Sequence, residues 1–285
     1  MNKAFLKKYL ADKLSLKELG KCSKSFDIVG DIAIIKVPLA IDNNRKKIIA
    51  KAVMVANKHV KTVLNQISPV SGRFRLRKLE HIFGERRTET LYKEYGCIFR
   101  VDLSKVYFSP RLSYERMRLA RLVKPKEVVI NMFAGVGCFS IMIAKHSETS
   151  KVYSIDINPK AMQLMRENIS LNKVVGRVET ILGDAREVIE PKLKDKADRV
   201  LMPLPAKSYE YLDTALIALR STGGFIHYYD FIHIKKGERP IEGIIKRVKK
   251  RISGLRVSFE VISSRIVRTV GPNWYQVVLD MKVLS

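Results

Sequence analysis

The sequence has few cysteines, no long apolar run and a shortage of acidic residues, and each absence excludes a class of protein. Cys22, Cys97 and Cys138 are the only 3 cysteines in 285 residues, too few for a disulfide framework and without the paired spacing of a zinc site. We therefore expect reduced thiols and no bound metal. No stretch approaches the roughly 18 consecutive apolar residues of a membrane span, and Met1–Leu19 alternates lysines with apolar residues instead of forming a signal-peptide core. These features predict a cytoplasmic protein without membrane association.

The shortage of acidic side chains leaves a strongly basic chain. Asp and Glu number 28 against 54 Lys and Arg, a formal net charge of +26. This charge favours a polyanionic partner, because binding one releases condensed counterions; a membrane surface or a basic surface without a partner is the alternative. Residues 1–110 hold 23 basic and 10 acidic side chains, and residues 111–285 hold 31 and 18. The first part is the more densely basic and is the better candidate for a nucleic-acid platform.

From about Glu127 onward, short β-branched runs alternate with amphipathic segments, which is typical of a parallel sheet covered by helices. Five strands are expected: Glu127–Met132, Lys151–Asp156, Val178–Leu182, Arg199–Met202 and Gly224–Tyr229. Helical spacing lies between them, over Phe139–Lys145, Pro159–Leu171 and Ser208–Leu219. The chain should end in a hairpin of Val257–Val267 and Trp274–Val283, with Trp274 in its core.

The first 110 residues are less regular and predict a small α/β domain. Phe26–Val37 alternates like one strand, and Arg45–Ala56 has helical spacing. Arg73–Val106 has the pattern of several short basic strands, with breaks at Gly72, Gly84 and Gly96. We therefore expect two domains, residues 1–110 and residues 111–285.

A glycine-containing loop follows the first strand of the second part and opens a helix. Met132–Gly137 (MFAGVG) places glycines where backbone amides can approach a ligand at a helix N-terminus. The loop lacks the third glycine of the dinucleotide fingerprint, because neither Phe139 nor Ser140, which follow Gly137, is a glycine. Taken alone, the loop is weak evidence for any one ligand.

Acidic residues end the next two strands of the pattern. Asp156, 19 residues after Gly137, can accept hydrogen bonds from both hydroxyls of a ribose, and Asp184 can accept one from the exocyclic amine of adenine. Both could instead only cap the helices that follow. Three features at successive strand ends converge on one nucleoside, and with the third glycine missing they favour S-adenosylmethionine over a nicotinamide dinucleotide. The residues expected around this cofactor are Phe133, Ala134, Gly135, Val136, Gly137, Asp156, Ile157, Asp184 and Ala185.

Together with the segments around it, this cofactor pattern resembles the archaeal and eukaryotic tRNA (guanine-37) N1-methyltransferases. The resemblance rests on six segments: Val106–Glu115 (VYFSPRLSYE), Asn131–Ser140 (NMFAGVGCFS), Ser154–Lys160 (SIDINPK), Leu171–Lys173 (LNK), Arg199–Pro205 (RVLMPLP) and Ile226–Tyr229 (IHYY). It implies a class I, Rossmann-like methyltransferase with a mostly parallel seven-stranded sheet, and a smaller N-terminal α/β domain on the RNA side. The implied reaction is S-adenosylmethionine-dependent methylation of ring nitrogen 1 of guanosine 37, on the anticodon stem-loop of tRNA. We expect a monomer.

The resemblance also implies a catalytic pair. Ring nitrogen 1 of guanine carries a proton, so a general base must remove it as the methyl group arrives. The family's glutamate in SPRL-x-x-E corresponds to Glu115, which outside that context would more simply form half of an exposed ion pair. An arginine that contacts the flipped guanine corresponds best to Arg75. Arg73 and Arg77 alternate with it like one face of a strand, and that face could instead bind phosphate.

Further residues are placed near the cofactor by resemblance alone. Tyr107 and Arg111 are expected at its methionine end. Pro203 is expected beside it, but it stands where these methyltransferases commonly have an asparagine, and proline donates no hydrogen bond from its side chain or backbone. Either a neighbour replaces that contact or the substrate is not plain guanine.

Other functions therefore stay open. Methylation of carbon-7 of a wyosine intermediate (4-demethylwyosine) and aminocarboxypropyl transfer in wybutosine synthesis are the alternatives at the same nucleotide, and a catalytically silent RNA-binding module is the competing class. Longer relatives have a separate domain that reads the tRNA elbow, whereas residues 1–25 offer at most one basic amphipathic helix. His227 is expected to be a hydrogen-bonded structural residue, and its neighbours Tyr228 and Tyr229 to stack on a base or line the site.

Overall fold

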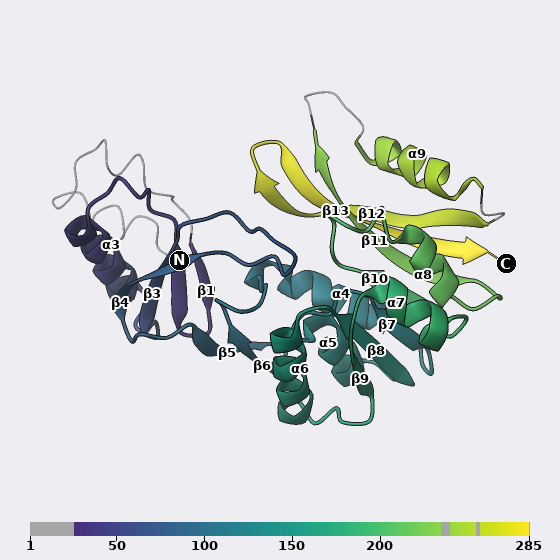
Figure 1. The fold of residues 1–285 in the computed structure, drawn as a ribbon, viewed down its shortest axis with the longest axis horizontal. Coiled ribbons are helices and arrows are strands. Elements are labelled where there is room, and N and C mark those ends of the chain that lie inside the picture. The colour runs from purple at the N-terminus through teal and green to yellow at the C-terminus, as the bar shows by residue number, and fades with distance from the viewer. Residues whose placement is uncertain (1–25, 235–239, 255–256, 285) are drawn as a thin grey trace. The chain divides into compact units, whose positions relative to one another are not determined.

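The computed structural model describes residues 26–234, 240–254 and 257–284 (Figure 1). Their contacts divide the chain into two units, Met1–Pro110 and Arg111–Ser285. The helix expected within residues 1–25, and Cys22 with it, lies outside the described residues. Cys97 and Cys138 are buried reduced thiols. No described helix has the length and apolar character needed to cross a membrane.

In the residues that the structure describes, the N-terminal unit is built on a four-stranded sheet with one helix. The strands β1 (Asp27–Val29), β2 (Ile32–Ile35), β3 (Thr62–Gln66) and β4 (Leu79–Gly84) lie in that order, and only β2 and β3 are parallel to each other. Helix α3 (Asn43–Ala56) connects these two strands. Its Ile49, Ala50 and Val53 pack on Val63 and Ile82 of the sheet, because the apolar residues of the segment recur at helical spacing. Asp42 caps the helix by accepting from the backbone N–H of Arg45 at 3.0 Å.

Two predictions for this unit are wrong. Phe26–Val37 is not one strand: the chain reverses at Gly30, whose φ of +56° lies outside the range of a strand, and β1 pairs antiparallel with β2. Arg73, Arg75 and Arg77 do not share a strand face either. Arg73 and Arg75 lie in a turn in which Ser71 and Leu76 exchange backbone hydrogen bonds of 2.9 and 3.0 Å, Arg75 has a φ of +54°, and Arg77 follows the turn.

A two-stranded hairpin completes the unit. Its strands, β5 (Glu89–Glu94) and β6 (Cys97–Asp102), pair antiparallel across a turn at Tyr95 and Gly96, both with positive φ. The glycine breaks expected at positions 84 and 96 are therefore both present. Cys97, Phe99 and Val101 alternate into the core while the residues between them are half-buried, which is the two-residue period of a strand.

The C-terminal unit contains the expected seven-stranded sheet, in the order β12-β13-β11-β10-β7-β8-β9. Its five parallel strands are β7 (Val128–Asn131), β8 (Lys151–Asp156), β9 (Val178–Leu182), β10 (Arg199–Met202) and β11 (Gly224–His233). The long hairpin of β12 (Ser258–Gly271) and β13 (Trp274–Leu284) adds two antiparallel strands beside β11. The predicted strands are confirmed, and β11 extends further than expected.

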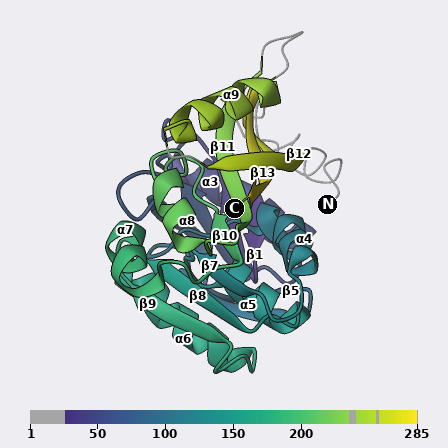
Figure 2. The ribbon, with the colours of Figure 1, turned by 90° about the vertical axis from the view of Figure 1, so that its right-hand side faces the viewer.

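Helices cover both faces of this sheet (Figure 2). Figure 2 shows α4 (Ser113–Leu122) and α5 (Cys138–His146) on one side and α7 (Ala185–Val188) and α8 (Leu212–Ala218) on the other. The short helix η1 (Pro110–Leu112) precedes α4, a π-helical turn η2 (Ile189–Leu193) follows α7, and α6 (Pro159–Leu171) follows β8. An unexpected helix, α9 (Pro240–Ile252), packs Ile244, Val248 and Ile252 into the same core as α7 and α8.

The tip of the terminal hairpin differs from expectation. Trp274 is 47% exposed and lies beside the ring of His233, with 5.2 Å between centroids, so it is not a core residue. Its position directly after the turn at Gly271–Asn273 places it beyond the last covered residues of the sheet.

The helix predicted over Ser208–Leu219 begins only at Leu212, because residues 205–211 form turns.

Candidate cofactor and catalytic sites

The glycine loop and the two predicted aspartates meet at the carboxyl edge of the parallel strands. The backbone N–H of Gly135 donates to Oδ2 of Asp156 at 2.7 Å, and that of Asn158 donates to Oδ1 at 2.9 Å. The backbone N–H of Gly183 in turn donates to the carbonyl of Asp156 at 3.0 Å. Three successive strand ends are therefore connected through Asp156, as the sequence pattern indicates.

The two loop glycines do different work. Gly137 has a φ of +88° and begins α5, and a Cβ there would lie 2.6 Å from Cγ of Met165, so a side chain cannot be accommodated unless the Met165 side chain shifts. Gly135 has a φ of +56°, and nothing lies within 4 Å of the position its Cβ would take. The open space beside Asp156 fits a bound nucleoside. Ala134, Val136 and Ala185 have buried side chains, so their contribution to a cofactor site would come from the backbone.

Asp156 is held as a hydrogen-bond acceptor. Burial raises the pKa of its carboxyl above the ordinary value, and the backbone N–H groups of Asn158 and Gly135 act in the opposite direction. These bonds come from the backbone, so they fix the direction of the carboxylate while each oxygen keeps a second lone pair. This arrangement is suited to the hydroxyls of a ribose.

Asp184 caps α7 and also joins an aromatic cluster that sequence reasoning missed. Its Oδ1 accepts from the backbone N–H of Arg186 at 3.0 Å, and its Oδ2 accepts from the hydroxyl of Tyr211 at 2.7 Å. The Tyr211 ring contacts that of Phe133 edge to face, with 5.2 Å between centroids, and the guanidinium of Arg186 lies over the Tyr211 ring, 4.1 Å from its centre. Burial and the bond to Asp184 raise the pKa of Tyr211 to about 12, so it donates at any physiological pH. No sequence signal marks Tyr211, because it lies 27 residues from its partner.

Pro203 directly follows β10, at the same edge of the sheet as Asp156. It is half-buried, and the turn around it is closed by bonds to the carbonyl of Met202, one from the backbone N–H of Leu204 and one from the hydroxyl of Ser208, both 2.8 Å. These donors are used within the turn. The hydrogen-bond donor that an asparagine would supply at this position is absent.

Glu115 is a buried carboxylate that accepts four hydrogen bonds. It lies in the first turn of α4, where negative charge is favoured, and it is 2% exposed. Its Oε1 accepts from the hydroxyl of Tyr229 at 2.6 Å and from Nη2 of Arg118 at 2.7 Å. Its Oε2 accepts from Nε of Arg118 and from Nη1 of Arg265, both at 2.9 Å. The exposed ion pair considered from the sequence is thus replaced by a buried cluster.

Tyr229 joins Glu115 to the glycine loop. In the register of the sheet, Tyr229 stands one residue beyond Tyr228, the partner of the last β10 residue, and therefore lies at the carboxyl edge. Its ring is 6.4 Å from that of Phe139, in the first turn of the helix that Gly137 begins. Burial, followed by the charge and hydrogen bond of Glu115, raises the pKa of Tyr229 well above its usual value. Tyr228 and Tyr229 are both fully buried and point to opposite faces, so neither presents a ring for base stacking.

Arg75, Arg77 and Tyr107 lie in the N-terminal unit. Arg75 is half-buried, with its guanidinium 5.8 Å from the ring centre of Tyr107. Arg77 donates to the backbone carbonyl of Phe108 at 2.8 Å and is thereby occupied in part. In the C-terminal unit, Arg111 is exposed in η1, just before α4. Among the described residues, no group of three or more His, Cys, Asp or Glu side chains could hold a metal ion.

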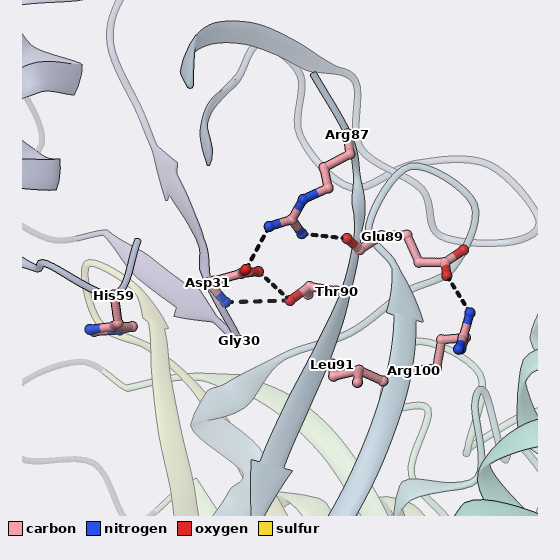
Figure 3. A pocket seen from close by; sticks show the side chains of 8 residues that line it. All are labelled: Gly30, Asp31, His59, Arg87, Glu89, Thr90, Leu91 and Arg100. Atoms are coloured by element: carbon pink, nitrogen blue, oxygen red, sulfur yellow. Dashed lines mark hydrogen bonds and ion pairs between the residues drawn. The ribbon is translucent and has the colours of Figure 1, made fainter. Parts of the chain in front are cut away.

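The N-terminal unit also has a pocket of about 500 Å³, lined by Gly30, Asp31, His59, Arg87, Glu89, Thr90, Leu91 and Arg100 (Figure 3). Its charged groups are paired: Asp31 with Arg87 at 2.6 Å and with Thr90 at 2.7 Å, and Glu89 with Arg100 at 2.9 Å. A Cβ on Gly30 would lie 2.2 Å from Oγ1 of Thr90. The pocket marks the junction where the turn between β1 and β2 packs on β5.

We predict a pH-dependent contribution of this junction to stability. Burial would raise the pKa of Asp31, but hydrogen bonds from Arg87 and Thr90 lower it below the ordinary 3.8. A lowered pKa means that the ionised group stabilises the fold above pH 3.8 and that this contribution is lost as the pH falls through and below that value. Asp31→Asn should therefore lower the unfolding midpoint at pH 7 by about 4 °C, the shift that about 1 kcal/mol produces in a small domain, with a smaller difference at low pH. Asp42→Asn, which preserves a helix cap, is the control in thermal unfolding followed by circular dichroism; equal losses at both pH values would contradict the assignment.

The seven-stranded sheet, with Gly135, Asp156 and Asp184 at the carboxyl edge of its parallel strands, defines an α/β Rossmann-like methyltransferase fold. Comparison with known proteins identifies the family. The family described as TRM5/TYW2 methyltransferase domain matches residues 90–259, and the TYW2 N-terminal domain matches residues 6–88. The chain therefore belongs to the TRM5/TYW2 methyltransferase family, which confirms the resemblance drawn from its motifs.

Individual relatives carry different activities in their names. The tRNA (guanine(37)-N(1))-methyltransferase Trm5b of Pyrococcus abyssi is 42% identical over 91% of this chain and 74% of that protein. The tRNA 4-demethylwyosine(37)-methyltransferase Taw21 of Saccharolobus solfataricus is 40% identical over 91% of this chain and 94% of that protein. Among solved structures, the complex of aTrm5 and tRNALeu has a TM-score of 0.86 at 37% identity and covers 100% of this chain and 79% of that one. The structure of TYW2 from M. jannaschii in complex with AdoMet has a TM-score of 0.69 at 31% identity and covers 91% and 99%.

Proposed function

We propose that this chain is a tRNA methyltransferase that uses S-adenosylmethionine to methylate ring nitrogen 1 of guanosine 37. The observation that carries the proposal is the buried carboxylate of Glu115, tied through Tyr229 to the glycine loop at the cofactor edge. A guanine nitrogen that carries a proton needs such an acceptor, because it is a poor nucleophile until the proton leaves. Relatives named tRNA (guanine(37)-N(1))-methyltransferase, at up to 42% identity, support the same reaction.

In this proposal one set of residues binds the cofactor and the target base, and Glu115 transfers the proton. Asp156 accepts from the ribose hydroxyls and Asp184 from the adenine amine, while the backbone around Gly135 leaves space for the nucleoside. The bound S-adenosylmethionine supplies an electrophilic methyl group on a positively charged sulfur. Glu115 takes the proton from ring nitrogen 1. Arg75 is the proposed contact to the target base, and Tyr107 and Arg111 are proposed contacts to the methionine end of the cofactor.

For the target base to reach the Glu115 carboxylate, one of the four hydrogen bonds to it must be broken. The four bonds fill the roughly four lone-pair positions of a carboxylate. Arg118 binds both oxygens, and Tyr229 is fully buried. Arg265 makes one bond to Glu115, is 30% exposed and lies on the edge strand β12, so it is the donor that can be displaced. Oε2 is then the oxygen that takes the proton.

Pro203 favours a second candidate reaction, methylation of carbon-7 of 4-demethylwyosine at the same nucleotide. At this position the chain offers no amide to a guanine edge, and a relative at 40% identity is named tRNA 4-demethylwyosine(37)-methyltransferase Taw21. Aminocarboxypropyl transfer, named for a relative at 36% identity, attacks another carbon beside the sulfonium. Incubation with S-adenosylmethionine and either unmodified tRNA or tRNA carrying the wyosine intermediate, followed by nucleoside mass spectrometry, tests all three. A 1-methylguanosine product supports our proposal, and modification of only the wyosine intermediate would refute it.

Charge on the surface of both units supports tRNA as the partner. In addition to the basic residues 1–110, helix α9 presents Lys246, Lys249 and Lys250, whose side chains are exposed and have no hydrogen-bond or ion-pair partner within the described ranges. The neighbouring Arg247 and Arg251 are instead paired with Asp230 and Asp213. The lysines are therefore available to phosphates. The expected monomeric state and cytoplasmic location stay predictions.

We predict a steep decrease of tRNA affinity with salt. Each neutralised phosphate releases counterions, so the logarithm of the binding constant should fall linearly with the logarithm of salt concentration between about 50 and 200 mM. Replacing Lys246, Lys249 and Lys250 by alanine should weaken the binding of all tRNAs to the same extent. It should also reduce the slope of this salt dependence by up to about 3, which is about 1 for each phosphate that is no longer neutralised. Arginine at the same three positions keeps the charge and should restore the slope. Filter binding that shows a flat salt dependence for the unmodified protein would contradict the electrostatic model.

A further inference from the structure

A network of buried, hydrogen-bonded polar side chains extends from Glu115 through the C-terminal unit. Arg118 binds Glu115 on one side and Asp280 on the other, and Asp280 binds His227, which binds Arg199. The exposed fractions of these side chains are 15% for Arg118, 8% for Asp280, 1% for His227 and 3% for Arg199. Members come from α4, β13, β11 and β10, so only the tertiary fold assembles them. The proposed methyl transfer uses none of them directly.

The guanidinium of Arg118 is fixed between two carboxylates. Nε and Nη2 bind Glu115 at 2.9 and 2.7 Å, while Nη1 and Nη2 bind Asp280 at 2.6 and 3.2 Å. A planar guanidinium held on two edges cannot rotate without breaking several charge-assisted bonds. Arg118 therefore determines the plane in which the Glu115 carboxylate lies, whereas the single bond of Arg265 does not.

Asp280 is itself fixed from behind. Burial lowers the pKa of His227 below its ordinary value, so the ring is neutral although Asp280 alone would act in the opposite direction. Nη1 of Arg199 donates to Nε2 of His227 at 2.7 Å, because arginine has no acceptor. The remaining ring proton is then on Nδ1 and donates to Oδ1 of Asp280 at 2.6 Å. Burial would raise the pKa of Asp280, but His227 and Arg118 hold it well below the ordinary value.

Arg199, at the other end of this network, is also held by several hydrogen bonds. Arg199 binds both carboxylate oxygens of Glu127 at 2.7 and 3.0 Å and the carbonyl of Leu122, the last residue of α4, at 2.9 Å. The polar chain thus begins at the first turn of α4 and returns to its last residue. Buried ion pairs of this kind are costly relative to apolar packing, so a role beyond stability is a reasonable expectation for them.

We propose that Asp280, acting through Arg118, is a positioning residue that orients Glu115 for proton transfer, with His227 and Arg199 holding Asp280 in place. The inference rests on the proposed function, since it assumes that Glu115 takes the proton. Asp280 contacts neither substrate nor cofactor in this assignment. Its removal should affect the transition state and leave substrate binding unchanged, because a misplaced acceptor slows the reaction without altering the contacts that hold the tRNA.

The test is a double-mutant cycle between Asp280→Asn and Glu115→Gln, measured as single-turnover methyl transfer to unmodified tRNA. Alone, Asp280→Asn should slow the maximal rate about 10- to 100-fold, with the half-saturating tRNA concentration unchanged. In the Glu115→Gln background it should change the rate by less than about threefold, because there is no base left to orient. Asp198→Asn is the matched control: this aspartate pairs with Arg220 at 2.9 Å in the same unit, at the amino end of β10, and its replacement should leave the rate unchanged.

The outcomes separate this inference from the proposed function. Equal slowing by Asp280→Asn in both backgrounds would show a general structural effect and overturn the positioning role, as would no slowing in the parent protein. If Glu115→Gln itself has no effect, the base assignment fails and the positioning role fails with it. If Asp280→Asn does not fold, Arg118→Lys replaces it in the double-mutant cycle. The lysine keeps one positive charge between the two carboxylates but loses the hydrogen bonds that the guanidinium makes on two edges. It too should change the rate by less than about threefold in the Glu115→Gln background.

Discussion

Glu115→Gln is expected to slow single-turnover methyl transfer to guanosine-37 tRNA by about 100- to 10,000-fold, the usual contribution of a positioned general base. The amide keeps the size of the side chain but cannot take the proton from ring nitrogen 1. Cofactor and tRNA affinities should stay nearly unchanged, because the interaction that is removed matters only in the transition state. The rate should be measured with excess enzyme by incorporation of labelled methyl groups.

A matched control and a second substrate sharpen this experiment. Glu260→Gln makes the same change at an exposed position of β12 and should leave the rate intact. Because the introduced amide would face both Arg118 and Arg265, unchanged cofactor affinity and thermal unfolding must accompany the comparison. At carbon-7 of a wyosine intermediate the ring carbon attacks first and loses its proton only after the methyl group has arrived, so the dependence of the transfer step on Glu115 should be weaker. A rate on guanosine-37 tRNA within about threefold of the parent protein would remove Glu115 as the base.

Asp156→Ala is expected to weaken S-adenosylmethionine binding by about 1.5–3 kcal/mol, the scale of hydrogen bonds to a charged group. The substitution removes the acceptor proposed for the ribose and also the anchors of the backbone N–H groups of Gly135 and Asn158. Asp156→Asn, which retains one acceptor oxygen, should have an affinity between those of the parent and the alanine variant. Isothermal titration calorimetry measures all three proteins.

Glu179→Ala supplies the comparison for this prediction. Glu179 lies on β9, is about half exposed and pairs with Lys151 at 3.3 Å, so it shares the charge of Asp156 without its position at the carboxyl edge. Its replacement should leave cofactor affinity unchanged. An Asp156→Ala protein that binds S-adenosylmethionine as tightly as the parent would rule out the nucleoside assignment at this edge.

The strands and the glycine loop could be predicted because their signals are local. Lys151–Asp156, Val178–Leu182 and Arg199–Met202 are strands with the expected bounds, since each is a short β-branched run bounded by turn residues. The positions of Gly135 and Asp156 follow from the same pattern, because parallel strands end at one edge of a sheet. Proximity of these two residues needed no long-range information beyond the strand order.

Local pattern failed where distant contacts decide the backbone. Gly30 has a positive φ because the turn must pass within van der Waals distance of Thr90, 60 positions along the chain. Arg73–Arg77 has strand-like alternation, but the turn closed by Ser71 and Leu76 overrides it. Trp274 suggests a core by its size, yet the hairpin tip has no layer above it to bury an indole among the described residues, and the ring is half exposed.

The sequence alone determined the fold class and the placement of the glycine loop and Asp156 at one edge of the sheet, because periodicity and turn motifs are encoded in neighbouring residues. The resemblance of the SPRL-x-x-E segment to the family indicated Glu115 as the candidate base. Tertiary structure alone decided what surrounds that base. Tyr229, Arg265 and Asp280 are between 114 and 165 residues from Glu115 in the chain, and no pattern of neighbours links them. Only the packing of α4 against β11, β12 and β13 brings their donors and charges together, because the cost of burying a carboxylate is offset solely by partners that folding delivers to it.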